Sequence, residues 1–377
     1  MSVLAPRPRT ASGRAILEVD LAAVTANVRT IKSRTAGEVM AVVKANGFGH
    51  GQVDVARAAL AGGATRFGVT SIDEALSLRA AGLTERVLSW LNPVGADFAT
   101  ALDQHIELGV PGLEHLRAIA RSAPGARIHL QLDTGMGRDG AEPAEWERLC
   151  REAREAERCG QVHVVGIMGH LPCADHPGHP ANAAGRDRFA WGSRVARSAG
   201  LRPADHHLAA TAATLSDPLA HHTMSRIGAG LVGIDESGTV RLRPALTLTA
   251  PLVSVRSVPA GTPVGYGHTW TTPRPTRLGL IPVGYADGLP RLASHRAEVW
   301  VRGARRPVVG RISMDMTVVD LGLDPLAPPV TVDDIVTVFG PGDHGEPTTA
   351  EWARWAQTLE HEIVTGLSAR PLRRSAP

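Results

Sequence analysis

This chain of 377 residues has few cysteines and no segment of membrane-spanning length, and we expect no secretory leader. Its three cysteines, Cys150, Cys159 and Cys173, are odd in number and lack metal-ligand spacing, so we expect reduced thiols and a cytoplasmic protein without a bound metal. No apolar run is long enough to cross a bilayer, which predicts no membrane partner. Residues 1–13 contain no apolar core of a signal peptide and are expected to form an N-terminal extension.

Clusters of basic residues are also missing, although the net charge is +3 and the pI is near 9.0. The arginines are scattered, and the densest basic stretch, residues 370–374, is short and terminal. The charge pattern therefore predicts no nucleic-acid partner. A length of 377 residues is large for one hydrophobic core, so we expect two domains.

Short apolar runs alternate with alanine-rich helical stretches over the first two thirds of the chain. Eight runs are candidate strands: 39–43, 67–70, 87–91, 106–108, 128–132, 162–168, 206–209 and 227–231. Plausible helices between them include 52–61, 73–81, 113–121 and 143–158. Eight strand–helix repeats predict an α/β fold of the TIM type, a (β/α)8 barrel over residues 14–243. A doubly wound open sheet is the alternative, which counting strands does not exclude.

The pattern changes after residue 243. The segment 245–258 alternates like a strand pair, and further strands are expected at 276–283, 298–301, 308–309, 317–321 and 335–339, separated by Gly, Pro and Asp turns. A last helix is expected over residues 350–367. Residues 244–377 are therefore predicted to form a mostly-β domain.

Lys44 stands at the end of the apolar run 39–43, directly before a turn rich in glycine. Burial lowers the pKa of a lysine, and a neutral amine is the form that makes a Schiff base. Gly47, Gly49 and Gly51 allow backbone N–H groups to approach an anion such as a phosphate. The alternative is a lysine that extends from a strand end to solvent beside an ordinary turn.

Four more polar residues follow or open predicted strands, at the rim where barrel enzymes place their chemistry. They are Arg138, His170, Thr211 and Arg226, the last of which opens the expected eighth strand. Each has a structural alternative: a surface ion pair for Arg138, a core position for His170, an N-cap for Thr211 and a loop support for Arg226. Together with Lys44 they form a plausible site for pyridoxal 5′-phosphate (PLP).

Seven ordered motifs resemble those of the bacterial alanine racemases, PLP enzymes built from a barrel and a β domain. They are AVVKANGFGHG (41–51), LDTGMGR (132–138), GIMGHL (166–171), RIG (226–228), GYG (265–267), GYADG (284–288) and GRISMD (310–315). Each motif alone is weak, but seven in this order on this layout are specific. The resemblance covers the chain from about residue 14 to its C-terminal region.

The resemblance implies a two-base racemisation of alanine or a related small amino acid. Lys44 resembles the Schiff-base lysine and one base, and Tyr266 resembles the opposite base, which a partner subunit of a homodimer delivers. Arg226 would meet the pyridine nitrogen of PLP, where an arginine disfavours transamination. His170 would line the ring pocket and orient Arg226. Tyr266 and Tyr285 are the only tyrosines of the chain, and the alternative for Tyr266 is an aromatic residue within a turn.

The remaining implied contacts concern phosphate and substrate. Thr211 and the backbone near Gly228 would line the phosphate site. Arg138, Tyr285 and Met314 would contact the substrate region, Met314 through its backbone N–H.

Four positions depart from the family pattern. Phe48 and His361 stand where tyrosines usually contact the phosphate, and Ala210 replaces a polar residue. Gln131 stands where many members have a carbamylated lysine that orients the arginine numbered Arg138 here. A lost hydrogen bond to the phosphate would cost about 1.5–3 kcal/mol.

Three functional classes follow from these patterns. The first is an amino-acid racemase with alanine as the default substrate, serving D-alanine biosynthesis or a specialised pathway. The second is a PLP enzyme of another reaction type on the same scaffold, such as a decarboxylase, an aldolase-like enzyme or a transaminating enzyme. The third is a PLP-binding protein without catalysis. Tyr266 and Arg226 favour the racemase.

Overall fold

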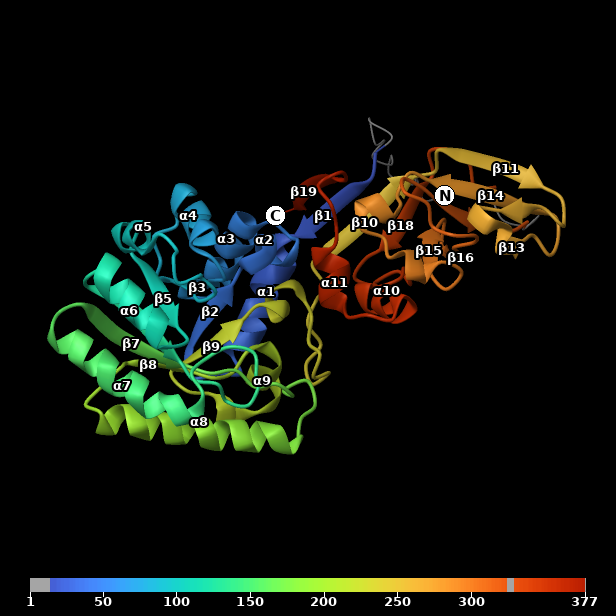
Figure 1. Ribbon diagram of the computed structural model, residues 1–377. Helices are drawn as coiled ribbons and strands as arrows, with labels where there is room; N and C mark the ends of the chain where they lie inside the picture. The colour runs from blue at the N-terminus through green and yellow to red at the C-terminus, as the bar shows by residue number, and fades with distance from the viewer. Residues whose placement is uncertain (1–13, 324–328, 377) are drawn as a thin grey trace. The chain divides into compact units, whose positions relative to one another are not determined.

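The computed structural model describes residues 14–323 and 329–376, which form two compact units. One unit is Ala22–Arg243, and the other combines the residues up to Leu21 with those from Pro244 onward (Figure 1). The N-terminal extension predicted over residues 1–13 lies outside the described residues. Each unit is described by itself below.

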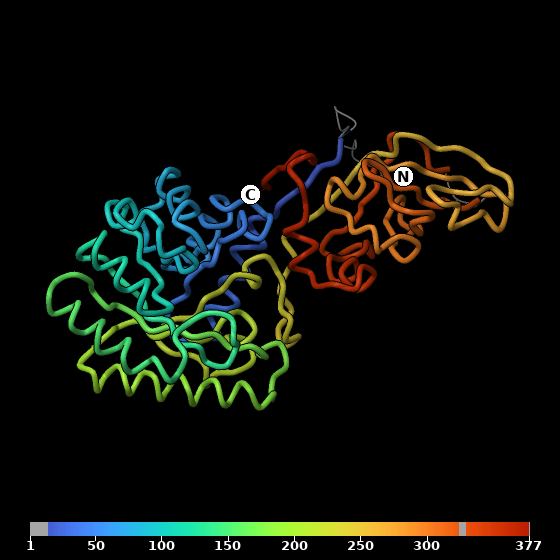
Figure 2. Tube along the Cα trace, viewed as in Figure 1, coloured from blue at the N-terminus to red at the C-terminus, as the bar shows by residue number. Residues whose placement is uncertain are grey.

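The unit Ala22–Arg243, which is described throughout, contains the predicted barrel of eight parallel strands. Its strands are β2 (Glu38–Val42), β3 (Arg66–Val69), β4 (Val87–Ser89), β5 (Ile106–Val110), β6 (Ala126–Gln131), β7 (Val162–Met168), β8 (Asp205–His207) and β9 (Met224–Ile227). The sheet order is β8-β7-β6-β5-β4-β3-β2-β9. The ring closes through a bridge between Ala210 and Arg226, where the Arg226 N–H donates to the Ala209 carbonyl at 3.0 Å. The trace of this ring can be followed in Figure 2.

Helices follow the strands and cover the outside of the ring. They are α1 (Leu21–Lys32), α2 (Lys44–Phe48), α3 (Gln52–Gly62), α4 (Ile72–Ala80), α5 (Phe98–Asp103), α6 (Leu113–Ser122), α7 (Pro143–Arg158), α8 (Pro180–Ser198) and α9 (Thr211–Ser216), with short 3-10 turns η1 (Pro218–Ala220) and η2 (Ala229–Val232). The strands of the barrel are largely buried, β3 and β5 at every residue, because helices cover one face and the interior of the ring fills the other. Met40, Leu88, Met168 and Met224 pack together in one buried cluster.

The eighth strand lies earlier than predicted. We expected a strand over residues 227–231, with Arg226 at its opening, but β9 ends at Ile227 and Arg226 is its third residue. Gly228 ends the strand, and the next residues form η2. The apolar run continues through both elements, so hydrophobicity alone placed the strand too late.

The second unit is mostly β, as predicted. Its strands are β1 (Ile16–Asp20), β10 (Leu246–Pro251), β11 (Ser254–Val258), β12 (Pro263–Val264), β13 (Trp270–Thr271), β14 (Thr276–Ile281), β15 (Glu298–Val301), β16 (Ala304–Pro307), β17 (Thr317–Asp320), β18 (Ile335–Phe339) and β19 (Leu372–Ala376). Its helical segments are η3 (Tyr266–His268), η4 (Tyr285–Asp287), η5 (Arg291–Ala293), α10 (Thr349–Ala356) and α11 (Glu360–Thr365). In the described part, a six-stranded sheet has the order β16-β15-β18-β10-β1-β19, and β11-β14-β17 and β12-β13 form two smaller sheets.

Four sequence predictions differ from this unit. Residues 14–21 were expected in the barrel, but β1 pairs with β10 and β19 and so belongs to the β unit. The pair expected within 245–258 is absent, because β10 and β11 enter different sheets. The strand expected at residues 308–309 is found directly before them, as β16 at Ala304–Pro307. The expected last helix is two helices, because Gln357 adopts a left-handed conformation (φ 56°) after α10.

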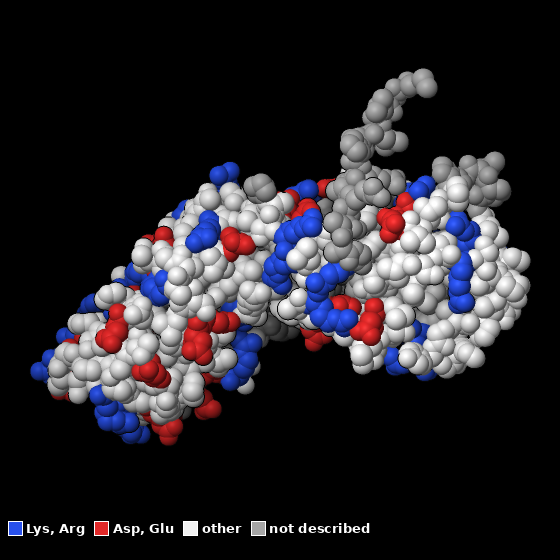
Figure 3. All heavy atoms as spheres, turned by 90° about the horizontal axis from the view of Figure 1, so that it is seen from above, with Lys and Arg blue, Asp and Glu red and all other residues white. Residues whose placement is uncertain are grey.

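Surface charge on the barrel unit is mixed in sign. Basic and acidic side chains are interspersed on its face in Figure 3. Along α7 they form ion pairs one helical turn apart, such as Arg148 with Glu152 at 3.1 Å. No helix in the described residues combines the length and the apolar character needed to cross a membrane.

Candidate active site

Lys44 lies two residues beyond the end of β2, at the start of a left-handed turn. Ala45, Asn46, Gly47 and Phe48 all have φ between 50° and 63°. Non-glycine residues seldom adopt this conformation, and several in succession indicate backbone strain that the surroundings must support. The turn therefore places Lys44 where the chain leaves the barrel strand and reverses direction.

The glycine-rich turn binds its own carbonyls. The N–H groups of Gly47, Gly49 and Gly51 donate to the carbonyls of Val43, Ala45 and Asn46 at 3.0, 3.0 and 2.8 Å. These amides were predicted as possible phosphate donors. Because they are already engaged, this turn does not offer them to an anion.

Glu74, in the first turn of α4, anchors the turn after Lys44. Its carboxylate accepts from the Ala45 N–H at 2.7 Å and from the N–H and hydroxyl of Thr70 at 2.8 Å each. The carboxylate thus fastens the residue after Lys44 to the C-terminal end of β3. Charge-assisted bonds of this kind are among the stronger hydrogen bonds in proteins.

Arg226 is buried inside the barrel, and neutral acceptors surround it. Its Nη1 donates to the carbonyl of His207 at 2.7 Å and contacts His207 Nδ1 at 3.0 Å. Its Nη2 donates to the carbonyls of Gly169 and Leu208 at 2.7 and 3.2 Å. No carboxylate pairs with Arg226 among the residues that the structure describes, and burial lowers the pKa of its guanidinium to about 10.

His170 is a further acceptor for the Arg226 guanidinium. The Nη2 group of Arg226 lies 3.2 Å from His170 Nδ1, which must accept. Burial, followed by the charges of Arg226, Arg138 and Lys44, lowers the pKa of His170 to about 3, so the ring is neutral at physiological pH. Thr134 fixes the backbone of His170, since its hydroxyl donates to the His170 carbonyl at 2.6 Å and accepts from the N–H at 3.0 Å.

Lys44 belongs to the same electrostatic group. Burial lowers the pKa of its amine, the positive charge of Arg138 lowers it further, and Glu74 partly opposes both effects. Arg138 itself is exposed, and it makes no ion pair within the described part of the chain. The structure thus brings Lys44, Arg138, His170 and Arg226 into one neighbourhood at the C-terminal ends of the strands.

Two backbone glycines join the loops beyond β8 and β9 to this neighbourhood. Phe48 packs on Gly228, where an added Cβ would lie 2.6 Å from Phe48 Cζ. Thr211 opens α9, and its hydroxyl accepts from the Gly230 N–H at 3.1 Å. Ala210, not Thr211, is the N-cap of α9, so the capping alternative for Thr211 is wrong.

The other predicted site residues lie in the second unit. Tyr266 opens η3 and is 69% exposed, between Gly265 and Gly267, both with φ of 72°. The turn of Tyr285 is bonded to the segment of Met314: the Tyr285 N–H donates to the Ser313 carbonyl at 3.0 Å and the next N–H donates to the Met314 carbonyl at 2.9 Å.

Both side chains are exposed on this segment, Tyr285 by 42% and Met314 by 53%. His361 lies on α11 and is partly buried. The structure therefore brings Tyr285 and Met314 together, and it leaves Tyr266, Tyr285, Met314 and His361 on a unit separate from Lys44.

Comparison with known proteins assigns both units to one family. Residues 19–236 match the model of the alanine racemase N-terminal domain, and residues 245–375 match that of the C-terminal domain. This chain belongs to the alanine racemase family.

Relatives of high similarity carry the same name. The alanine racemase of Thermobifida fusca (strain YX) is 43% identical over 363 residues, covering 93% of this chain and 95% of that protein. The structure of the Streptomyces coelicolor A3(2) alanine racemase is 43% identical, with a TM-score of 0.93 over 97% of this chain and 98% of that one. A Bartonella henselae alanine racemase, described with covalently bound pyridoxal phosphate, is 26% identical with a TM-score of 0.87, covering 96% of this chain and 99% of that one.

Two positions of this alanine racemase family member were not singled out from sequence. His207 contacts Arg226, and the Thr134 hydroxyl hydrogen-bonds to the backbone of His170. The sequence does contain one signal for His207, namely polar residues in a predicted barrel strand. The observed strand, β8, has three residues, and two of them are histidines.

Gln131 departs from the pattern common in this family. Its side-chain N–H donates to Asp139 at 3.3 Å. Its amide oxygen is buried and has no hydrogen-bond partner within the described residues. An acceptor therefore lies at the end of β6, a few residues before Arg138.

Proposed function

We propose that this protein is a PLP-dependent alanine racemase that interconverts L- and D-alanine and supplies D-alanine in the cytoplasm as a homodimer. Family membership supports the reaction class. The observation that carries the proposal is the group of Lys44, His170 and Arg226: an amine of lowered pKa stands near a neutral imidazole and a buried guanidinium that pairs with no carboxylate among the described residues.

The donor set of the barrel fits PLP. Lys44 Nζ would hold the cofactor covalently, and Arg226 would meet the ring nitrogen with its guanidinium, since its charge finds no carboxylate in the described residues. His170 would line the ring. When bound, PLP withdraws electrons from the substrate Cα and makes its proton acidic.

The phosphate end of the cofactor fits the loops after β8 and β9. Thr211 and the backbone from Gly228 onward would line the phosphate, since the hydrogen bond from the Gly230 N–H to the Thr211 hydroxyl holds these two segments together. Phe48 adds an apolar wall and no hydroxyl, and His361 is the other position that the family pattern assigns to the phosphate. The engaged amides of the turn after Lys44 agree with a phosphate held elsewhere.

Two bases on opposite faces of Cα account for racemisation. Lys44 Nζ would take and return the proton on one face, which its lowered pKa favours. The hydroxyl of Tyr266 of the partner subunit would act on the other face. The 69% exposure of Tyr266, in a turn where glycines flank it, suits presentation to a second chain.

Substrate recognition would fall to Arg138 and to the segment that carries Tyr285 and Met314. The Met314 backbone N–H would bind the carboxylate, and Tyr285 would line the substrate region. The buried oxygen of Gln131 would accept from Arg138 in place of a carbamylated lysine.

A labelling experiment tests the role of Lys44 directly. The sequence contains only two lysines, Lys32 and Lys44, so borohydride reduction of the PLP-loaded protein can mark very few amines. We expect the pyridoxyl mass on the peptide with Lys44, its loss in Lys44→Ala, and full labelling in the matched control Lys32→Ala. Labelling of Lys32 alone would refute the assignment.

Proton exchange separates the functional classes. In D2O, single enantiomers of alanine should acquire deuterium at Cα and yield the opposite enantiomer without loss of carbon. Release of CO2, an aldehyde or a keto acid would favour the second class, and binding of PLP without exchange would favour a carrier. Tyr266→Phe should suppress deuterium exchange at the Cα of one enantiomer more than at that of the other. An unchanged exchange rate from both enantiomers would exclude Tyr266 as a base.

A further inference from the structure

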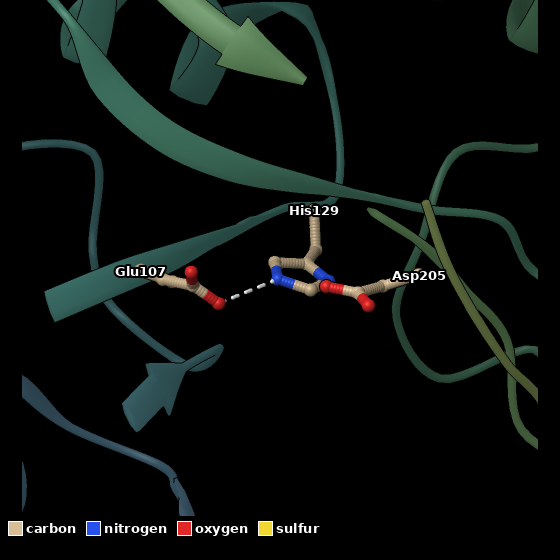
Figure 4. A group of neighbouring side chains, drawn as sticks. All are labelled: Glu107, His129 and Asp205. Atoms are coloured by element: carbon tan, nitrogen blue, oxygen red, sulfur yellow. Dashed lines mark hydrogen bonds and ion pairs between the residues drawn. The ribbon is translucent and has the colours of Figure 1, made fainter. Parts of the chain in front are cut away.

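A chain of buried polar side chains runs through the barrel interior away from Arg226. His207 contacts Arg226 through Nδ1 at 3.0 Å and His129 Nδ1 through Nε2 at 2.9 Å. His129 Nε2 then contacts Glu107 Oε2 at 3.0 Å. Glu107, His129 and His207 are 2%, 0% and 0% exposed. Figure 4 shows the last link, from β5 to β6.

The hydrogen bonds fix the direction of every proton in this chain. Arg226 can only donate, so His207 Nδ1 accepts and His207 carries its proton on Nε2. That proton is donated to His129 Nδ1, which leaves His129 protonated on Nε2 and donating to the Glu107 carboxylate. Burial and the charge of Arg226 keep the pKa of His207 well below its usual value, so the ring stays neutral. Each imidazole is thus held in one tautomer by its neighbours.

Glu107 is the fixed end of the chain because it remains ionised. Burial alone would raise the pKa of its carboxyl, but hydrogen bonds from His129, Arg86 and Arg127 outweigh burial and hold the pKa far below its usual range. Arg86 Nε and Arg127 Nε donate to Glu107 Oε1 at 2.7 and 2.8 Å. The other oxygen, Oε2, faces His129.

A metal ion is a poorer explanation of this cluster. Glu107, His129 and Asp205 have ligand atoms within 4.8 Å of one another. However, Asp205 Oδ2 already accepts from Arg66 and Arg86 at 2.6 and 2.8 Å. The carboxylates are therefore neutralised by guanidinium groups, and Figure 4 shows Asp205 beside the His129 ring without a bond to it.

We propose that Glu107 is a positioning residue for the racemase site, acting through the tautomers of His129 and His207 to present an acceptor to Arg226. The inference rests on the proposed function in one respect: it takes the pyridine ring of PLP as the group that Arg226 meets. Glu107 touches neither cofactor nor substrate. It keeps the His207 Nδ1 that faces the guanidinium unprotonated and able to accept, and thereby holds that guanidinium in place.

Glu107→Gln is the sharpest perturbation because it keeps the shape and removes one acceptor. The amide has a single oxygen, and two guanidinium donors compete for it against one imidazole. The amide N–H2 should therefore face His129 and reverse the chain: His129 and His207 would carry their protons on Nδ1, and His207 would present an N–H to the donor of Arg226. Loss of one such bond to a charged group corresponds to a fall of about ten-fold or more in kcat.

Asp205→Asn is the matched control. Asp205 is as deeply buried, at 5% exposure, and binds two arginines of the same cluster, but it accepts from neither histidine. A purely structural role for Glu107 predicts that both variants lose stability and leave the tautomers alone. A positioning role predicts reversed tautomers and a reduced kcat only for Glu107→Gln, with a smaller change in KM.

The tautomers are measured by 15N NMR of histidine-labelled, cofactor-free protein, with signals assigned through single-site variants. In the unaltered protein, His129 and His207 should each show a protonated Nε2 and an unprotonated Nδ1; a protonated Nδ1 on His207 overturns the inference even where Glu107→Gln does not fold. Unchanged tautomers and kcat in Glu107→Gln, or the same reversal in Asp205→Asn, also overturn it. The NMR measurement needs no cofactor. If the protein shows the predicted tautomers but has no racemase activity, the proposed function is refuted and the role of Glu107 in setting the tautomers is not.

Discussion

The packing of Phe48 on Gly228 makes Gly228→Ala a demanding test of the site. Gly228 has a φ of −116°, so alanine meets no left-handed backbone there. Its Cβ would nevertheless lie 2.6 Å from Phe48 Cζ, 2.8 Å from Cε2 and 3.5 Å from the Val42 Cβ. Ordinary contacts begin at 3.4 Å, so the ring must retreat by about 1 Å.

The expected cost follows from the burial of that ring. Phe48 is 8% exposed and lies in a strained turn held by the backbone hydrogen bonds of Gly47, Gly49 and Gly51, so it has little freedom to move. Overpacking of a core typically costs 1–3 kcal/mol, and the stiffer unfolded chain of alanine returns about 0.4–1 kcal/mol. We therefore expect Gly228→Ala to lose about 1–2 kcal/mol of unfolding free energy in urea titrations of the cofactor-free protein.

Two further variants make the result decisive. Gly95→Ala is the control, because no atom lies within 4 Å of the Cβ that it would add. Phe48→Leu should relieve the collision, so the double variant with Gly228→Ala should be more stable than the sum of the single changes predicts. If Gly228→Ala is as stable as Gly95→Ala, or if the two changes at the contact are additive, the packing argument is wrong.

Two other predictions concern protonation and backbone strain. The pKa of His170 falls from 6.5 to about 3 through burial and the charge of Arg226, so between these values the unfolded chain binds a proton that the folded cofactor-free protein does not. The free energy of unfolding should therefore fall as the pH drops through this window, with about 2 kcal/mol from His170 at pH 5; His170→Gln should flatten the slope, and an equal slope would contradict the assignment. Gln357→Gly should raise the unfolding free energy by about 0.5–1 kcal/mol because φ is 56°, whereas Ala81→Gly, at a helix end with φ of −81°, should lower it; a loss at both positions would count against strain at Gln357.

Much of the barrel is predictable from sequence because most of its strands lie in short, mainly apolar runs. Most predicted strands lie within two residues of the observed ones, and β7 and α7 match at both ends. The errors fall where an apolar run continues past the end of an element. The apolar run through Ile227 continues into η2, so the hydrophobic signal extends past the end of β9. A helical composition likewise continues across Gln357, past the end of α10. Both elements end where the backbone conformation changes, which side-chain hydrophobicity does not encode.

The candidate site divides in the same way. Lys44, His170 and Arg226 stand at strand ends and can be anticipated, but the polar chain behind them cannot. Glu107, His129 and His207 come from three different strands, β5, β6 and β8. Whether a polar residue in a buried strand points into the ring or toward the helices depends on the shear of the closed barrel, which a single sequence does not reveal.

The strand β1 has a consequence for how the protein is made. It lies between β10 and β19, with Glu18 opposite Thr247 on one side and Arg374 on the other. A ribosome releases β1 hundreds of residues before either partner exists, so the nascent chain carries a strand with two open edges while the whole barrel is synthesised and folds. Completion of the β unit must await the arrival of Leu372–Ala376, and a chain cut short of that strand would expose one edge of β1 to other chains.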